Sequence, residues 1–253
     1  MAERFLSRVV LVTGATGGLG LGIARAFSRE GAAVVLAARR ADVGERAAEE
    51  LRSSGGEATF VQADVSAPDD ARRLVAAAVS RYGRLDLAIN NAGIGGTGRR
   101  TADYPIDTWR DVLSVNLDGL FYCMKWEIPE LLKQPHAAIV NMASVSGFVA
   151  APVGCAYTAS KHGVIGLTRA AAMEYAPKGL RVNAVAPAVV RTAINEQTFF
   201  ANAETEARIV AQHPLGRVGT IDEVAAAVLW LCSDEASFVT GSVLTVDGGF
   251  LAQ

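Results

Sequence analysis

The sequence predicts an α/β protein with one doubly wound, parallel β-sheet, and three observations support this fold class. Short apolar runs rich in β-branched residues alternate with longer helix-like runs from one end of the chain to the other. A glycine-rich turn directly follows the first apolar run. The chain has 253 residues, 51% of them hydrophobic, which is enough apolar material for one large core.

The predicted strands are short apolar runs. The first, RVVLVT, is continuously apolar after its arginine, as in a strand that is buried on both faces of a parallel sheet. The later runs AVVLAA, ATFVQAD, LDLAIN, AAIVNMAS, LRVNAVAP and SVLTV have the same character. The strands are predicted at residues 8–13, 33–38, 58–64, 85–90, 137–144, 180–187 and 242–246.

Helical periodicity fills the stretches between these runs. The first helix follows the glycine turn and ends at Gly31, and the segment 155–176 has many alanines and no interior proline. Further helices are predicted at 42–53, 68–82, 107–134 and 222–233. Strands that alternate with helices in this way predict right-handed crossovers and a Rossmann-type, seven-stranded αβα sandwich. Residues 1–253 form one predicted domain, and the long irregular segment 188–213 is a predicted substrate lid.

Composition narrows the function classes. The formal net charge is −2 and no long run of like charge occurs, so neither nucleic acid nor a membrane surface is an expected partner. The N-terminal apolar run is too short for a signal peptide, and no stretch reaches transmembrane length. Three cysteines without paired or metal-type spacing fit a reducing compartment. A cytoplasmic protein without a metal site is expected.

The glycine-rich turn TGATGGLG, residues 13–20, is a predicted dinucleotide-binding loop. Its glycines let the backbone pass close to a pyrophosphate, and the following helix offers unpaired N–H groups and a partial positive charge. The context of a strand before and a helix after favours cofactor binding over a structural turn.

The end of the second predicted strand favours NADP(H) over NAD(H). Ala38 stands where an acidic residue would bind the ribose of NAD, and Arg39 and Arg40 follow it. A guanidinium can hold the 2′-phosphate of NADP with two charge-assisted hydrogen bonds. NAD(H) stays open as an alternative, because Gly17 occupies a loop position where a second basic residue would strengthen the case.

The motifs together resemble those of the short-chain dehydrogenase/reductase family, in its compact single-domain branch. TGATGGLG, ADV (63–65), NNAG (90–93), SVN (114–116), Ser144, YTASK (157–161) and VAPAVVRT (185–192) occur in the order and spacing of that family, over essentially the whole chain. The resemblance implies a catalytic tetrad of Asn116, Ser144, Tyr157 and Lys161. It also implies that Asn116 anchors a water that relays protons from Lys161.

Physical chemistry supports these roles. Tyr157 and Lys161 stand four residues apart, on one face of a predicted helix. A free phenol has a pKa of about 10, and lowering it to about 7 needs roughly 4 kcal/mol, which an ammonium and an oxidised nicotinamide can together supply. Ser144 follows the fifth strand, at the edge where open α/β sheets bind ligands. Hydride transfer between a nicotinamide and a ketone or secondary alcohol is therefore predicted, with Tyr157 as the general acid/base.

The resemblance also implies the cofactor contacts. The residues expected to bind the nucleotide are Gly14, Thr16, Gly17, Gly18, Leu19, Gly20, Arg39, Arg40, Asp64, Val65, Asn91, Ala92, Gly93, Tyr157, Lys161, Pro187, Val190 and Thr192. One departure from the family pattern is Ala188, which stands where a glycine usually follows the proline.

The substrate side is predicted to be apolar. The expected contacts are Ser144, Val149, Val153, Tyr157, Val189 and Phe199, which favour an apolar, aromatic or cyclic small molecule over a sugar phosphate or dicarboxylate. A 3-oxoacyl-acyl-carrier-protein reductase is the alternative within the family, and a non-catalytic nucleotide-binding regulator is the alternative from another class. The resemblance further implies a homotetramer, in which the helices near 107–134 and 155–176 pair across a two-fold axis and the C-terminal edge completes the assembly.

Overall fold

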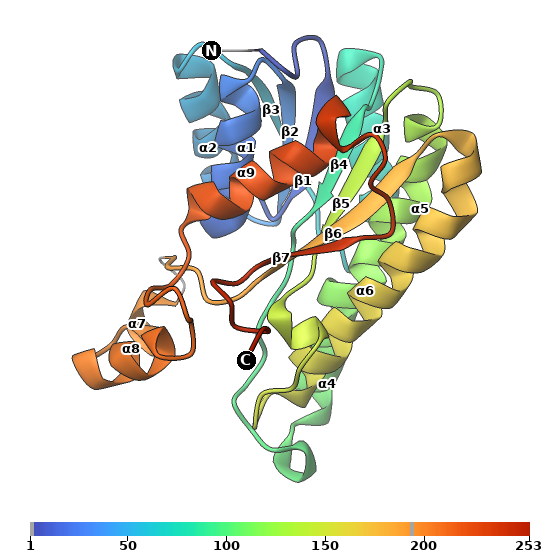
Figure 1. Cartoon of the computed structure of the whole chain (residues 1–253). Helices are drawn as coiled ribbons and strands as arrows, with labels where there is room; N and C mark the ends of the chain where they lie inside the picture. The colour runs from blue at the N-terminus through green and yellow to red at the C-terminus, as the bar shows by residue number, and fades with distance from the viewer. Residues whose placement is uncertain (1–2, 193–194) are drawn as a thin grey trace.

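The structure, a computed structural model, describes residues 3–192 and 195–253 and contains the predicted sheet (Figure 1). Within that part of the chain the sheet has seven strands in the order β3-β2-β1-β4-β5-β6-β7, and every neighbouring pair is parallel. The strands are β1 (Val9–Thr13), β2 (Ala33–Ala38), β3 (Glu57–Gln62), β4 (Leu87–Asn90), β5 (Ala138–Met142), β6 (Arg181–Pro187) and β7 (Val243–Val246). The predicted fold class is confirmed.

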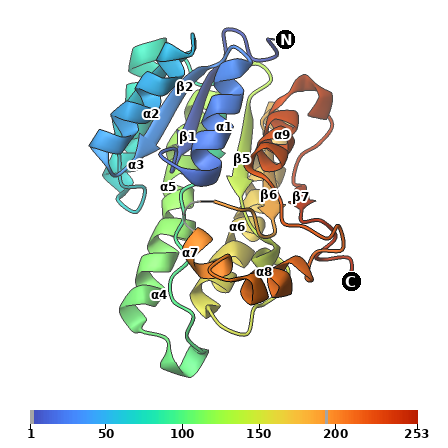
Figure 2. The same ribbon diagram turned by 90° about the vertical axis from the view of Figure 1, so that its left-hand side faces the viewer.

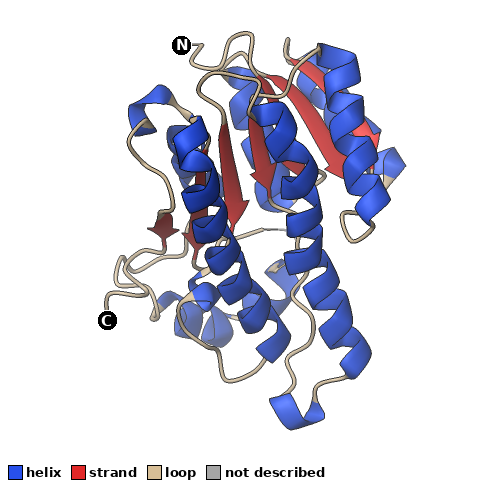
Figure 3. Cartoon of the chain, turned by 90° about the vertical axis from the view of Figure 1, so that its right-hand side faces the viewer, coloured by secondary structure: helices blue, strands red, loops and turns tan. Residues whose placement is uncertain are grey.

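Helices cover both faces of the sheet, as Figures 2 and 3 show from opposite sides. One face carries α1 (Gly18–Arg29), α2 (Ala41–Ser53) and α9 (Ile221–Cys232), and the other carries α3 (Pro68–Tyr82), α5 (Gly119–Leu131) and α6 (Cys155–Tyr175). The shorter helices are α4 (Ile106–Leu113), α7 (Glu196–Phe199) and α8 (Ala203–Val210). Among the described residues, no helix is long and apolar enough to span a bilayer.

The core lies in two layers, one on each side of the sheet. In β1, Val10 and Val12 pack against the layer under α1 and α9, whereas Val9 and Leu11 pack against the layer under α3, α5 and α6. Successive side chains of a strand point to opposite faces, so a strand buried on both sides must be apolar at every position. This geometry explains the continuous apolar run in the sequence.

The predicted helix at 107–134 is interrupted in the structure. Residues Ser114–Asp118 form a π-helical turn, and the N–H of Gly119 donates to the carbonyl of Ser114, five residues earlier. Gly119 packs closely against Val65, because a Cβ atom on this glycine would lie 2.9 Å from the Val65 Cγ2. The wider turn contains Asn116, whose side chain is buried.

The predicted lid segment 188–213 is more regular than expected, because it contains α7 and α8. Asn202 caps α8 by accepting a hydrogen bond from the Thr205 N–H at 2.9 Å. Figures 1 and 2 show α7 and α8 at the end of the molecule opposite the N-terminus, and Figure 1 shows them well apart from α4. Residues 193 and 194 of this segment lie outside the described residues.

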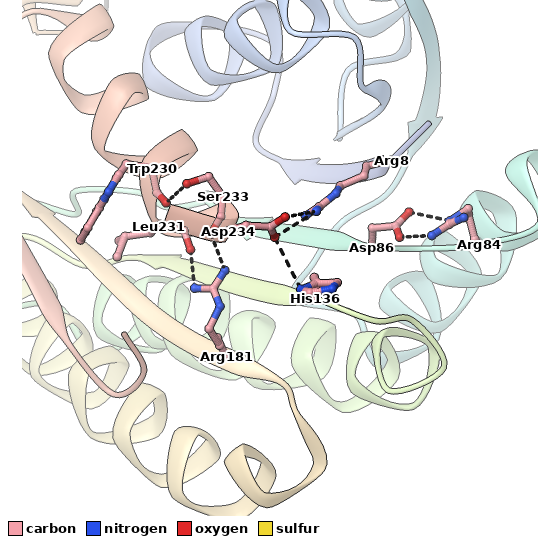
Figure 4. Close-up of polar contacts among 9 residues, drawn as sticks. All are labelled: Arg8, Arg84, Asp86, His136, Arg181, Trp230, Leu231, Ser233 and Asp234. Carbon is pink, nitrogen blue, oxygen red and sulfur yellow. Dashed lines mark hydrogen bonds and ion pairs between the residues drawn. The ribbon is translucent and has the colours of Figure 1, made fainter. Parts of the chain in front are cut away.

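Ion pairs fasten the amino ends of the strands (Figure 4). Asp234, just after α9, binds Arg8 at 3.1 Å and lies 3.6 Å from the His136 imidazole. Asp234 therefore joins the residue before β1 to the segment before β5. Asp86, just before β4, accepts from the Val9 N–H at 2.8 Å and pairs with Arg84. These contacts hold the edge of the sheet that is remote from the predicted chemistry.

Arg181 completes this edge through backbone contacts. Its guanidinium donates to the carbonyls of Leu231 at 2.6 Å and Ser233 at 3.1 Å (Figure 4). The last carbonyls of a helix have no partner within the helix. Arg181 therefore ties the C-terminal end of α9 to the start of β6.

Replacing Arg181 by methionine is expected to lower the free energy of unfolding by roughly 1–3 kcal/mol, because two partly buried carbonyls lose their donor. Arg46→Met is the control, since Arg46 is exposed on α2 and its ion pair with Asp42 spans a single helical turn. The control should change stability by less than about 0.5 kcal/mol in urea unfolding. Equal stability of the two variants would contradict the role given to Arg181.

Candidate active site

The glycine loop between β1 and α1 is shaped to receive a phosphate group. Gly14 and Gly18 have positive φ angles of 65° and 49°. A Cβ atom on Gly20 would lie 2.3 Å from the Gly14 carbonyl oxygen, so only glycine permits this approach of helix to strand. No side chain caps the start of α1, and its first turn has no acidic residue. The first N–H groups of this helix can therefore bind an anion.

A polar tie joins the loop to the end of β4. The Asn91 side chain donates to the carbonyls of Thr13 at 2.9 Å and Gly14 at 3.3 Å. In return, the Thr13 hydroxyl accepts from the backbone N–H groups of Asn91 at 3.0 Å and Ala92 at 3.1 Å. These four bonds align the carboxyl ends of two neighbouring strands.

Arg39 and Arg40 lie at the end of β2, where the sequence predicts contact with the cofactor. Both side chains are exposed, and neither guanidinium forms an ion pair within the described residues. The Arg39 carbonyl accepts a hydrogen bond from the Gln62 side chain at 2.9 Å, which fixes the backbone at this point. The guanidinium groups of Arg39 and Arg40 thus face solvent at the end of β2, next to β1 and the glycine loop that follows it.

Asp64 and Val65 follow β3, next to the same edge. One carboxylate oxygen of Asp64 accepts from the N–H and the hydroxyl of Ser66, at 3.0 and 2.7 Å, and so shapes the turn before α3. Val65 is buried and packs on Gly119. Asp64 therefore has a structural task in addition to its predicted place beside the adenine.

Asn116, in the π-helical turn, is held by hydrogen bonds at both ends of its amide. Its Oδ1 accepts from the Ile94 N–H at 2.8 Å, and its Nδ2 donates to the Ile94 carbonyl at 2.9 Å. The same Nδ2 donates to the hydroxyl of Ser160 at 3.1 Å, and that hydroxyl donates to the Tyr157 carbonyl at 2.8 Å. Asn116 thereby couples the loop after β4 to the helix that carries Tyr157 and Lys161.

The other three predicted catalytic residues meet beyond the end of β5. Lys161 is buried, donates through Nζ to the Met142 carbonyl at 2.6 Å, and lies 5.6 Å from the centre of the Tyr157 ring. Ser144 accepts from the Ser146 N–H at 3.1 Å, and its hydroxyl is hydrogen-bonded to that of Tyr157. The structure thus brings the tetrad together in the predicted arrangement.

The protein groups around Tyr157 do not by themselves lower the pKa of its phenol. Burial raises the pKa of Tyr157, and the hydrogen bond with Ser144 opposes that shift only in part. Burial also lowers the pKa of Lys161 to about 8. The ammonium lies near the ring and donates to a backbone carbonyl, so desolvation outweighs its attraction for a phenolate. Acidification of Tyr157 therefore needs positive charge beyond that of Lys161.

The segment after β6 lies against the glycine loop. Val190 is buried, and its carbonyl accepts from the Asn195 side chain at 2.7 Å. The Thr192 methyl group lies 3.7 Å from the place of a Cβ on Gly18. Ala188, which replaces the family's usual glycine, is not among the described residues with positive φ, so alanine causes no left-handed strain there. Its N–H bonds to Val246 at 3.2 Å, which continues the pairing of β6 with β7 beyond Pro187.

Arg191 fastens the predicted lid to this segment. Its guanidinium pairs with Glu196 of α7 at 2.9 Å and with Glu206 of α8, and it stacks over the Phe200 ring at 4.0 Å. Phe200 is buried beneath it. Arg191 is thus engaged by the lid, a role that the sequence does not reveal.

The predicted substrate contacts other than Ser144 and Tyr157 are apolar and accessible. Val149, Val153 and Phe199 have 43%, 40% and 42% of their surface exposed, and Val189 is half-buried. Val153 lies 3.9 Å from the place of a Cβ on Gly98, in the loop after β4. Exposed apolar side chains therefore surround the end of the molecule that carries the tetrad.

Sequence reasoning missed two positioning groups in the site. Ser160 is buried and supports Asn116, and its signal is a hydroxyl on the buried face of the YTASK helix. Tyr104 accepts from the Thr97 N–H at 3.3 Å and packs against Gly96, which supports the loop after β4. Ser160 belongs to the YTASK motif, whereas Tyr104 belongs to no pattern of fixed spacing that could identify it.

Comparisons with known proteins agree with this geometry. A family model described as enoyl-(acyl carrier protein) reductase matches residues 14–251. Cyclohexanol dehydrogenase of Acinetobacter sp. strain SE19 is 41% identical over 253 residues, which cover 100% of this chain and 98% of that enzyme. A-factor type γ-butyrolactone 1′-reductase (1S-forming) of Streptomyces virginiae is 43% identical over 246 residues, covering 96% and 95%. The crystal structure of levodione reductase is similar with a TM-score of 0.94 and 34% identity, covering 98% and 99%.

The chain belongs to the short-chain dehydrogenase/reductase family, as its motifs predict. It is an oxidoreductase that acts on CH–OH groups and uses a nicotinamide dinucleotide.

Proposed function

We propose that the protein interconverts an apolar cyclic ketone and its secondary alcohol with NADP(H), and that Tyr157 is the general acid/base. The observation that carries this proposal is the convergence of Tyr157, Ser144 and Lys161 beyond the end of β5, with the glycine loop at the same edge of the sheet. The glycine loop fits a dinucleotide, because a Cβ at Gly17 would meet no protein atom within 4 Å, which leaves open space beside the uncapped start of α1.

In the proposed mechanism, the glycine loop and the start of α1 would hold a nicotinamide dinucleotide, which would supply or accept the hydride and, in its oxidised form, contribute a positive charge. Ser144 orients the substrate oxygen, and Tyr157 gives or takes the proton of that oxygen at its hydroxyl. Lys161 keeps a positive charge near the Tyr157 ring, and Asn116 holds the facing loop in place.

The proposed preference for NADP(H) depends on Arg39 and Arg40. Their exposed guanidiniums follow β2, where a 2′-phosphate would lie, and Ala38 introduces no competing carboxylate. NAD(H) remains the alternative cofactor.

The proposed substrate class depends on the exposed apolar residues Val149, Val153 and Phe199 and on the engagement of Arg191 by the lid. Two of the similar proteins reported above are named cyclohexanol dehydrogenase and levodione reductase, and both names refer to enzymes that act on ring compounds. We therefore place cyclic ketones and alcohols ahead of charged metabolites.

The basic residues around β5 offer little to dock an acidic carrier protein, and the exposed Arg99 and Arg100, in the loop beside Gly154, are the cations nearer to the tetrad. Lys133 and His136 precede β5, at the edge opposite the tetrad, and are paired with Glu130 and Asp234. A docked carrier protein needs a basic rim at the mouth of the site itself. A non-catalytic regulator is disfavoured because all four tetrad residues are present and assembled.

A homotetramer and a cytoplasmic location are part of the same proposal. Phe121 of α5 and Met173 of α6 have 46% and 80% of their surface exposed, as expected for helices that pair with a second copy. Alanines on a helix surface let two helices approach closely, but of the consecutive Ala170, Ala171 and Ala172 of α6 only Ala170 is exposed, whereas the other two face the sheet. All three cysteines are unlinked, in keeping with a reducing compartment.

Tyr157→Phe is expected to lower kcat for a panel of cyclic ketones by about 10²- to 10⁴-fold, because the proton donor is lost. Binding of NADPH, measured by fluorescence, should persist. Tyr175→Phe, on the same helix and outside the site, serves as control and should retain wild-type turnover. Unchanged kcat in Tyr157→Phe would favour the regulator, and a strong preference for an acyl-carrier substrate would favour the acyl-carrier reductase.

Arg39→Asp is expected to raise the Kd for NADPH by about 10-fold or more, since a hydrogen bond to a charged group contributes about 1.5–3 kcal/mol. The Kd for NADH should change far less. Arg46→Asp makes the same charge change on α2 and should leave the ratio of the two constants as in the wild type. If Arg39→Asp weakened the binding of NADPH and NADH equally, Arg39 would not be the residue that selects NADP(H).

Static light scattering should give a mass four times the 26.5 kDa of the chain. Met173→Asp is expected to shift the mass downward, because a charge would enter the proposed contact between α6 helices. A wild-type mass of 26.5 kDa would rule out the tetramer.

A further inference from the structure

A chain of buried polar side chains lies beneath the site, between the sheet and the two helices α5 and α6 that cover the same face of it. Asn90 of β4 donates through Nδ2 to Glu127 Oε2 at 3.0 Å and to Asn141 Oδ1 at 3.1 Å. Asn141 of β5 donates to the Thr168 hydroxyl at 3.0 Å, and that hydroxyl donates to the Val164 carbonyl at 2.7 Å. Glu127, Asn90, Asn141 and Thr168 are all buried.

Two atoms of this chain have no hydrogen-bond partner in the described part of the protein, namely Asn90 Oδ1 and Glu127 Oε1. Both are acceptors if Glu127 is ionised, and an unsatisfied buried acceptor costs free energy. They are the second oxygens of two groups that are already joined through Nδ2 and Oε2. A carboxylic acid and a primary amide can form a cyclic pair, in which the amide N–H donates to one acid oxygen and the acid O–H donates to the amide oxygen.

We propose that Glu127 is held as a neutral carboxylic acid in a cyclic acid–amide pair with Asn90, and that this pair positions the ends of β4 and β5. One proton on Oε1 satisfies both orphaned oxygens, and every polar side chain from Glu127 to Thr168 then has a partner. A carboxylate would instead place a full negative charge among buried groups and leave both of these oxygens without a donor.

The surroundings of Glu127 favour the proton. Burial raises the pKa of Glu127 to about 7, and the hydrogen bond from Asn90 opposes this shift. On its own helix, the buried Cys123 thiol faces it, and the pKa of that thiol is raised by burial and by Glu127. From α3, the buried residues are Ala71, Leu74, Val75 and Ala78, while Asp69 and Asp70 pair with Arg72 and Arg73 at the surface of that helix and Arg81 lies over the Tyr82 ring. From α6, the polar group in the chain is the Thr168 hydroxyl, and β4 and β5 contribute the two amides.

The pair lies directly behind groups of the active site. Asn90 precedes Asn91 and Ala92, which hold the glycine loop through Thr13. Asn141 precedes Met142, whose carbonyl accepts from Lys161. Ionisation of Glu127 would disturb both strand ends. The consequence for turnover rests on the proposed function, whereas the protonation state does not.

Because the pKa of Glu127 is higher in the folded than in the unfolded chain, its contribution to the free energy of unfolding falls as the pH rises. The pKa of Glu127 is about 7 in the folded protein and ordinarily 4.5. Below pH 4.5 both the folded and the unfolded chain hold the proton. Between pH 4.5 and 7 only the folded chain holds it, so its folding equilibrium weakens by about tenfold per pH unit. Above pH 7 the loss is complete and stays constant.

The direct test is infrared difference spectroscopy of wild type minus Glu127→Gln. At pH 6 we expect the C=O stretching band of a protonated carboxylic acid, which disappears with a midpoint near pH 7. Glu130→Gln, on the same helix and near the surface, should give only the bands of an ionised carboxylate. Carboxylate bands alone for Glu127 at pH 6 would overturn the inference.

Glutamine can form the same cyclic pair without titrating, so thermal unfolding gives a second test. The Tm of Glu127→Gln minus that of the wild type should rise between pH 4.5 and 7 and then level off. A difference that is independent of pH would count against the proposal.

Neutron diffraction of wild-type crystals needs no variant. A deuteron between Glu127 Oε1 and Asn90 Oδ1 would support the pair, and a water or a bare carboxylate there would refute it.

Turnover gives the readout for the positioning role. The fall of kcat on the alkaline side of pH 7 should move to higher pH in Glu127→Gln and stay in place in Glu130→Gln. If the infrared band is present but this shift is absent, Glu127 is neutral but does not position the site. If no ketone is turned over at all, the proposed function fails while the infrared and Tm tests still decide the protonation state.

Discussion

The alignment of the carboxyl ends of β1, β4 and β5 is the constraint on which the rest of this protein depends. Apolar packing fixes the strands side by side, but it is insensitive to small shifts along their length. Hydrogen bonds between buried polar groups supply the missing precision: Asn91 locks β4 to β1, and Asn90 locks β4 to β5. Such bonds are strong in a low-dielectric interior and costly to leave unmade, so they specify one register.

The two edges of the sheet are built differently. At the amino edge, charged side chains such as Asp234 and Arg181 fasten strands and helix ends to one another. At the carboxyl edge, the glycine loop, Asn116 and Lys161 use backbone carbonyls and amides in place of ion pairs. Because these hydrogen bonds are to neutral groups, no carboxylate compensates the positive charge of Lys161. A site that stabilises a phenolate requires such an uncompensated positive charge. The amino edge of the sheet therefore contributes mainly to stability, and the carboxyl edge carries the residues of the candidate active site.

Much of the fold and the tetrad could be predicted, because local patterns encode them. Continuous apolar runs such as Val9–Thr13 mark strands buried on both faces, and the spacing of Tyr157 and Lys161 places them on one face of a helix. The π-helical turn at Asn116 could not be predicted, because helical periodicity tolerates one extra residue in a turn. The extent to which the protein desolvates Tyr157 also could not be predicted, since desolvation depends on the whole surrounding structure.

The sequence by itself determined the order of strands and helices, the glycine loop and the identity of the four tetrad residues, because each depends on residues close together in the chain. Only the tertiary structure decided what those residues touch. It assigned Arg191 to the lid, Ala171 and Ala172 to the core, and Glu127 to Asn90, which lies 37 positions away. Burial and hydrogen-bond partners arise from segments distant in sequence, and no local pattern records them.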